Sequence, residues 1–225
     1  MYLYSLKKWV GLITVLALPG VIYYFVVQAE NHFMPLATIG VEGHVIPEFT
    51  FINQHNDTIT KTNYEGNIYV ANFFFTSCPK ICPNMISKMK YLQDKLSIYP
   101  NIKFLSHTVD PENDTPDKLL EFTSYMDINL ENWNFVTGNK QEIYSIASSY
   151  LVSAGKEDKS EPGGFFHSER LVLIDKEGKV RSGIDIQGNP YGNYNSRDES
   201  DIKTLVKDIK VLMAEYKKKE HNNEK

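Results

Sequence analysis

The sequence has few cysteines and no excess of basic residues. Its two cysteines exclude a small fold stapled by several disulfides and a metal site built from four cysteines. Its 24 basic and 28 acidic residues give a net charge of −4, which argues against a nucleic-acid binder, because such proteins need a basic surface. Internal repeats and low-complexity linkers are also missing. With 225 residues, 42% of them hydrophobic, the chain is expected to form one globular domain with additional segments.

The first 33 residues carry a long uncharged stretch. Trp9 to Val27 is 19 residues without a charge, and as a helix it would extend roughly 28 Å, close to the thickness of a hydrocarbon core. Lys7 and Lys8 precede it, and Glu30 is the first charge after it. The positive-inside rule then leaves the N-terminus in the cytoplasm. We predict an uncleaved inner-membrane anchor over residues 1–33, with the rest on the periplasmic or extracytoplasmic side.

Two alternatives compete with the membrane anchor. A cleaved signal peptide would need a site of small residues, for which Val27-Gln28-Ala29 is a poor match. A buried core helix is disfavoured because the stretch lies at the extreme terminus.

The remaining chain shows an alternating pattern of strands and helices. Residues 34–218 are predicted to form one soluble α/β domain, and residues 219–225 a charged tail. Residues 34–225 hold 22 basic and 27 acidic residues, a net charge of −5. Strands are expected over residues 49–52, 58–60, 67–75, 102–109, 133–136, 170–174 and 179–184, and helices from Pro83, from Thr115-Pro116, and over 140–150 and 201–217. This order predicts a mixed central sheet with helices on both faces.

Both cysteines lie in the loop that follows the most apolar predicted strand. Thr76 to Pro83 reads Thr-Ser-Cys-Pro-Lys-Ile-Cys-Pro and opens a helix. In open α/β sheets, sites lie beyond the carboxyl ends of the strands. A helix N-terminus favours thiolates, so we expect Cys78 and Cys82 to be more acidic than free cysteine. Three intervening residues let the two sulfurs approach, as a disulfide or as ligands of a soft metal. An inert structural disulfide is the alternative, although so short a loop would stabilise the fold little.

A metal site needs a third ligand, and the six histidines are the candidates for that role. His167 follows Gly163-Gly164 and shortly precedes the strand that begins at Arg170, so a neighbouring strand could bring it beside the cysteine loop. The pattern alone leaves that assignment open. His107 lies within a strand, where a packed side chain is the simpler interpretation. The others lie near the anchor, before the domain, in a turn or in the tail: His32, His44, His55 and His221.

Three stretches together resemble one family. Thr76–Pro83 looks like the cysteine motif of the Sco/SenC family of copper chaperones. Val109–Pro116 (Val-Asp-Pro-Glu-Asn-Asp-Thr-Pro) is similar to the second signature of that family. His167-Ser168, followed by Leu173-Ile174-Asp175, resembles the third. The stretches occur in the order of the family, and the resemblance runs from about residue 43 to residue 185.

This resemblance implies a thioredoxin-like fold that binds one copper ion, as Cu(I) or Cu(II), through Cys78, Cys82 and His167. It also implies a role in maturing the copper A centre of cytochrome c oxidase. The implied partners are the copper-binding subunit of the oxidase, and another copper chaperone or a thiol reductase. Asp110 matches an aspartate near the site, where it would support the metal or face a partner; ending the strand and shaping the turn is an equal alternative. Met85 and Met89 have the helical spacing of core residues rather than of ligands.

Two segments depart from what the resemblance leads us to expect. Ser182 to Tyr191 is longer and more polar than we would expect from such a resemblance, which leaves the partner at that edge open. The charged, glycine-rich loop from Ser153 to Phe166 leaves the distance between His167 and the thiols undetermined.

Other functions use the same residues. A thiol–disulfide oxidoreductase would cycle Cys78 and Cys82 between dithiol and disulfide through a mixed disulfide with its target. Thioredoxin-like reductases resemble one another in a proline just before the strand that here begins at Arg170, and this sequence has His167-Ser168-Glu169 instead. The C-x3-C spacing, in place of C-x2-C, also favours metal binding. A peroxiredoxin-like peroxidase, for which Thr76 is one residue too close to Cys78, and a non-catalytic interaction domain are further alternatives.

Overall fold

The computed structural model describes residues 2–29, 34–79, 81–152, 169–185 and 187–223. The chain divides into two compact units, Met1–Met34 and Pro35–Lys225. The first unit contains the helix α1 (Tyr2–Ala29), with Pro19 inside it. Within the described ranges, no helix reaches the length and apolar character needed to cross a membrane.

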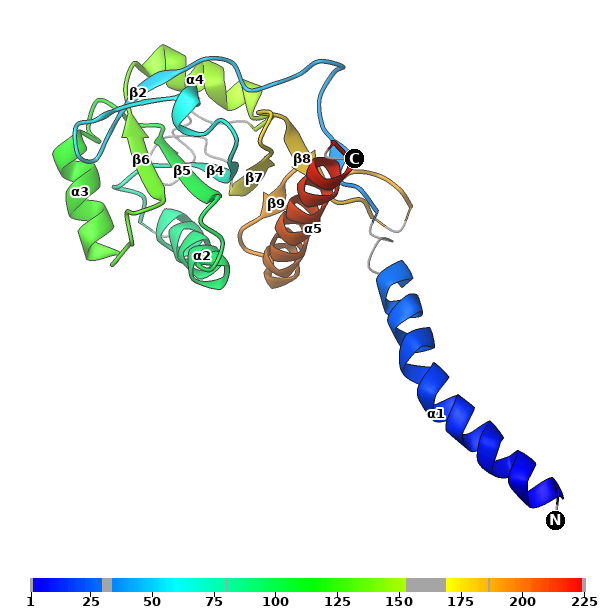
Figure 1. Ribbon diagram of the computed structural model, residues 1–225. Helices are drawn as coiled ribbons and strands as arrows, with labels where there is room; N and C mark the ends of the chain where they lie inside the picture. Colours follow the sequence, from blue (N-terminus) through cyan, green and yellow to red (C-terminus); the bar gives the residue numbers. More distant parts are fainter. Residues whose placement is uncertain (1, 30–33, 80, 153–168, 186, 224–225) are drawn as a thin grey trace. The chain divides into compact units, whose positions relative to one another are not determined.

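The second unit is built on a mixed sheet (Figure 1). Its strand order is β1-β8-β7-β4-β5-β6-β2-β3, and β9 pairs with β7. The three central strands β4, β5 and β6 are parallel, whereas β7 is antiparallel to β4. The strands are β1 (Ala37–Thr38), β2 (Thr50–Asn53), β3 (Thr58–Thr60), β4 (Ile68–Phe74), β5 (Ile102–Thr108), β6 (Trp133–Thr137), β7 (Arg170–Ile174), β8 (Val180–Ser182) and β9 (Tyr194–Asn195).

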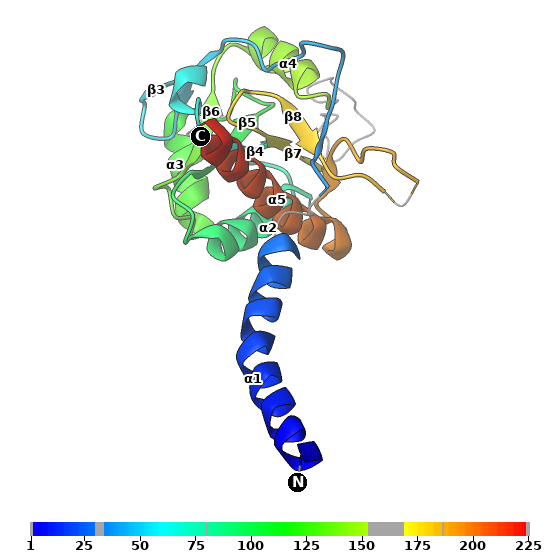
Figure 2. The same cartoon turned by 45° about the vertical axis from the view of Figure 1, so that its right-hand side comes forward.

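Helices cover both faces of this sheet. Phe73 and Phe74 are consecutive in β4 and therefore point to opposite faces. Phe73 contacts Tyr150, which ends one helix, and Phe74 contacts Phe122 of another. Two further helices, α2 (Ile81–Leu96) and α5 (Glu199–Asn223), lie side by side in both views (Figures 1 and 2). The helices are α2 (Ile81–Leu96), α3 (Pro116–Tyr125), α4 (Lys140–Ser149) and α5 (Glu199–Asn223), with a short 3-10 turn, η1 (Lys61–Asn63).

The structure confirms the α/β prediction and most of the predicted elements within one or two residues. Local signals explain this agreement. All seven residues of β4 are buried, as its apolar run predicted. Thr115 caps α3 through its side chain, and Pro116 is the first helical residue. The final helix is longer than the predicted 201–217, since it continues through the lysine-rich segment to Asn223. The predicted loop over residues 153–165 lies outside the described residues.

The segment after β8 returns to the sheet as an extra strand that the sequence pattern did not predict. The carboxylate of Asp185 accepts backbone hydrogen bonds from Gln187 and Asn189 and closes the turn. Tyr194 in β9 then donates its hydroxyl proton to the buried carboxylate of Asp208 in α5, at 2.8 Å. The polar stretch between β8 and β9 is thus held at both ends by hydrogen bonds.

A buried ion cluster connects the start of the domain with α5. Arg181 in β8 lies 2.9 Å from a carboxylate oxygen of Asp175 and 2.7 Å from one of Glu215. The same guanidinium donates to the carbonyl oxygen of Leu36, and the amide of Leu36 donates to Glu215 at 2.5 Å. These hydrogen bonds hold Leu36 against α5. Removing one charged member of the cluster would leave an uncompensated buried charge.

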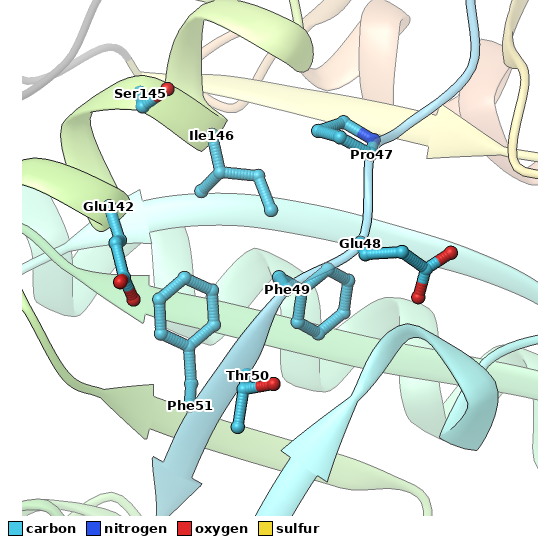
Figure 3. Close-up of a pocket in the computed structure, with 8 residues that line it drawn as sticks. All are labelled: Pro47, Glu48, Phe49, Thr50, Phe51, Glu142, Ser145 and Ile146. Atoms are coloured by element: carbon cyan, nitrogen blue, oxygen red, sulfur yellow. The ribbon is translucent and has the colours of Figure 1, made fainter.

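His107, in the centre of the sheet, is surrounded by aromatic rings. It stacks on Phe73 with ring centroids 4.8 Å apart and meets Phe51 edge-on at 5.6 Å. Phe49 and Phe51, which both contact His107, also line a surface hollow of about 370 Å³ beside α4 (Figure 3). Neither ring nitrogen has a hydrogen-bond partner among the described residues. Burial lowers the pKa of His107 to about 3, opposed in part by the nearby backbone of Asn72. The prediction of a packed histidine is therefore confirmed.

His107 should make the fold sensitive to acid. The unfolded chain takes up a proton below about pH 6.5, whereas the folded protein does not until about pH 3. Stability from this residue is therefore present above pH 6.5 and is lost as the pH falls toward 3. Between pH 7 and 5 the loss should be about 2 kcal/mol. We expect His107→Phe to remove this part of the pH dependence of the free energy of unfolding, measured by urea titration. His55→Gln, at an exposed turn, is the control; an unchanged slope in His107→Phe would contradict the assignment.

Candidate metal centre

The two cysteines lie at the edge of the sheet where the parallel strands end. β4 ends at Phe74 and α2 begins at Ile81, so the connecting loop places Cys78 just before the helix and Cys82 in its first turn. Both side chains are buried and no disulfide joins them. The amide of Cys82 donates a hydrogen bond to the sulfur of Cys78 at 3.2 Å. The approach predicted from the C-x3-C spacing is thus observed.

The two thiols differ in how they meet solvent. Cys78 is 4% exposed, whereas Cys82 is fully buried. The hydrogen bond with Cys78, together with burial, raises the pKa of the Cys82 thiol well above its ordinary value. The expectation that both thiols are more acidic than free cysteine is therefore wrong for Cys82. Deprotonation of Cys82 would place a negative charge beside the Cys78 sulfur in a buried site. The free-energy cost of that charge outweighs the stabilisation by the helix N-terminus.

Asp114 joins the cysteine loop to the neighbouring strand. Its carboxylate accepts the backbone amide of Thr76 at 3.0 Å and the hydroxyl groups of Thr76 and Thr108. Burial raises the pKa of Asp114, although these hydrogen bonds oppose the shift. Because Thr76 lies two residues before Cys78, this carboxylate fixes the start of the loop. Its position in the Asp-Pro-Glu-Asn-Asp stretch was noted in the sequence, but its role was not recognised.

Asp110 follows β5 and is also buried, with 4% of its surface exposed. Both carboxylate oxygens accept hydrogen bonds from the side-chain amide of Asn113, at 3.0 and 2.9 Å. Its carbonyl oxygen accepts the amides of Asn113 and Asp114. These contacts give Asp110 the turn-shaping role that the sequence left open, and its role toward a metal or a partner stays a prediction.

A hollow of about 500 Å³ lies beside the cysteine loop. Thr76, Ser77 and Asn113 form one side of it, and α3 forms the other through residues that include Tyr125. Tyr125 is 85% exposed. Ser77, which lines the hollow, directly precedes Cys78 in the chain.

No group of three or more metal-ligating side chains occurs among the residues that the structure describes. His167 lies outside those residues, so the third ligand stays a prediction. The described histidines have other surroundings: the ring of His44 donates to the carbonyl oxygen of Ser149 at 2.8 Å, and His107 is packed in the core. The structure thus places Cys78 and Cys82 together, with Asp110 and Asp114 in the loop after the adjacent strand.

Comparison with known proteins identifies the family. A sequence model of the SCO1/SenC family matches residues 39–195, more than half of the chain. The chain belongs to the SCO1/SenC family. Its match begins just after the ion cluster at Leu36 and ends at Asn195 in β9, so it includes the cysteine loop, both aspartates and the extra strand.

Individual relatives agree with this membership. The SCO1 protein homolog of Bacillus subtilis is 30% identical over 167 residues, which cover 73% of this chain and 81% of that protein. The structure of BsSco, described as a member of the Sco family of cytochrome c oxidase assembly proteins with a disulfide switch, superposes with a TM-score of 0.63. It is 28% identical, and the match covers 75% of this chain and 93% of that one. Arabidopsis thaliana ScoI with copper bound shares the fold, with a TM-score of 0.56, 24% identity and coverage of 74% and 98%. The thioredoxin-like fold prediction is thereby confirmed.

Asp114 should control the order of the cysteine loop. We expect Asp114→Ala to lower the free energy of unfolding by about 1–3 kcal/mol, because the buried donors of Thr76 and Thr108 lose their acceptor. Amide hydrogen exchange, followed by mass spectrometry, should rise in residues 76–82. Asp117→Ala, an exposed carboxylate in the first turn of α3, should leave exchange in that loop unchanged. Equal exchange in both variants would show that Asp114 does not hold the loop.

Proposed function

We propose that this protein is a membrane-anchored copper chaperone that assists maturation of the copper A centre of cytochrome c oxidase. Its cargo is one copper ion, held by Cys78, Cys82 and His167. The observation that carries the proposal is the pair of buried thiols one helical turn apart, with an amide of the helix N-terminus on the Cys78 sulfur. This pair occurs in a member of the SCO1/SenC family, in the stretch Thr76–Pro83 that resembles the cysteine motif of that family.

The donor set suits copper. Thiolates and imidazole are soft to borderline ligands; with two sulfurs and one nitrogen they favour Cu(I), and a further weak donor would accommodate Cu(II). Binding requires deprotonated sulfurs, and the Cys82 amide bound to Cys78 stabilises negative charge there. Asp114 holds the loop in place through Thr76. His167 would complete the set from the segment that precedes β7.

The alternative function is a thiol–disulfide oxidoreductase that reduces cysteines of the oxidase subunit or of other exported proteins. The adjacent thiols, which no disulfide joins, favour it as well, since their oxidation to a disulfide releases two protons and two electrons to a target disulfide. The relative BsSco has a disulfide switch. Copper binding needs the same reduced thiols, so the two activities are compatible.

The membrane anchor belongs to the same proposal. Residues 1–33 would hold the protein in the inner membrane with the domain on the periplasmic or extracytoplasmic side. Support comes from the uncharged stretch Trp9 to Val27 and from Lys7 and Lys8 before it. The copper-binding subunit of the oxidase, and another copper chaperone or a thiol reductase, would then meet the protein at the membrane.

Copper binding is tested by anaerobic titration of Cu(I) into reduced residues 34–225 against a competing chelator. We expect one tight equivalent. The double variant Cys78→Ser/Cys82→Ser should abolish it, and His167→Ala should weaken it by about 10–1000-fold, because the third ligand is lost while the dithiolate remains. His55→Ala is the matched control and should bind like the parent.

The titration also separates the two functions. Absence of tight binding would overturn the chaperone and favour the oxidoreductase. Tight binding that does not depend on His167 would leave a dithiolate site and remove the proposed third ligand.

The anchor is tested on the full chain in membranes. We expect it to stay in the pellet after alkaline carbonate extraction and to keep its N-terminal residues in intact-mass measurement. Residues 34–225 alone should appear in the supernatant. A mature chain that begins near Glu30 would show that the segment is a cleaved signal peptide.

A further inference from the structure

The final helix carries a row of exposed lysines that take part in none of the described hydrogen bonds or ion pairs. Four positions of α5 are separated by four, three and seven residues, which puts them within an arc of about 80° on a helix of 3.6 residues per turn. All four are exposed, and none forms an ion pair with any residue in the described ranges. We call them the lysine stripe: Lys203, Lys207, Lys210 and Lys217.

The acidic residues of α5 neutralise this stripe only in part. Asp208 and Glu215 are buried and bind Tyr194 and Arg181. Glu199 pairs with Lys88, and Glu220 pairs with Lys176. The stripe is therefore a row of positive charge about 21 Å long on a protein whose net charge is −4. Glu199 partly balances Lys203 and Asp208 partly balances Lys207.

The start of the domain is fastened to the same helix. The backbone of Leu36 binds Glu215 and Arg181. Only six residues lie between Ala29, the end of α1, and Leu36, and the seven steps along the chain extend at most about 25 Å. If α1 lies in the membrane, as proposed above, the part of α5 around Glu215 is kept within about that distance of the lipid headgroups.

We propose that the lysine stripe binds the surface of an anionic lipid bilayer. The positive row complements anionic headgroups, and the short tether keeps α5 within reach of them. Each lysine near such a surface increases lipid partitioning about fivefold, and the effect weakens with salt. This contact would orient the domain on the membrane instead of leaving it free to rotate about its tether. The proposal rests on the anchor for the tether, but its chemistry resides in α5 alone.

The test uses residues 35–225, which form a compact unit that contains all the core residues. They are sedimented with vesicles of phosphatidylcholine plus phosphatidylglycerol, or of phosphatidylcholine alone, at low salt. We expect association with the anionic vesicles only. Replacing the four stripe lysines by Gln should weaken it by at least about 100-fold, and replacing them by Arg should preserve it.

A second variant controls for net charge. Lys90, Lys95, Lys118 and Lys140 lie on α2, α3 and α4, and changing them to Gln removes the same four charges. This variant should keep most of the association. Equal loss in both Gln variants, or equal association of the parent with the two kinds of vesicle, would overturn the proposal. Absence of association would overturn it too, in favour of an acidic protein as partner of the stripe. The assay contains neither copper nor the anchor, so its outcome is independent of the titration and the carbonate extraction.

Discussion

The site depends on one constraint, the parallel pairing of β4 with β5. Their seven paired residues, from Ile68 with Ile102 to Phe74 with Thr108, bring the carboxyl ends of the two strands to one edge. The loop that carries the thiols and the loop that carries Asp110 therefore have to meet. The carboxylate of Asp114 fastens one to the other through Thr76 and Thr108. The register of β4 on β5 and the bonds of Asp114 therefore fix the position of the loop that carries Cys78.

Burial and the hydrogen bond between the cysteines determine how the two thiols are protonated. A closed site shields Cys82 from water and raises the pKa of its thiol, so the metal-free protein keeps that thiol protonated. Cys78 is slightly exposed and receives the amide of Cys82. The pair is therefore asymmetric before any ligand arrives. A soft cation that displaces the proton would supply the positive charge that two adjacent sulfurs otherwise lack.

Much of the fold could be predicted because its signals are local. The continuous apolar run of β4 and the Thr115-Pro116 start of α3 each depend on a few neighbouring residues. The cysteine loop was recognised for the same reason. The missed features join distant parts of the chain: Asp114 with Thr76, and Arg181 with Leu36 and Glu215. The order of charged residues along the chain does not show which carboxylates are buried. The raised pKa of Cys82 was missed for a similar reason. The helix N-terminus, which favours a thiolate, can be recognised in the sequence, whereas the burial of Cys82 against the sulfur of Cys78 cannot.

The same long-range contacts connect the two ends of the domain to the thiol pair. Arg181 holds Leu36 to α5 at one end of that helix. Near the other end, Glu199 pairs with Lys88 of α2, and the two helices lie side by side (Figures 1 and 2). Cys82 is part of α2, so α5 joins the point where the chain enters the domain to the helix that carries a thiol. Whatever limits the orientation of α5 therefore limits the direction in which the cysteine loop faces.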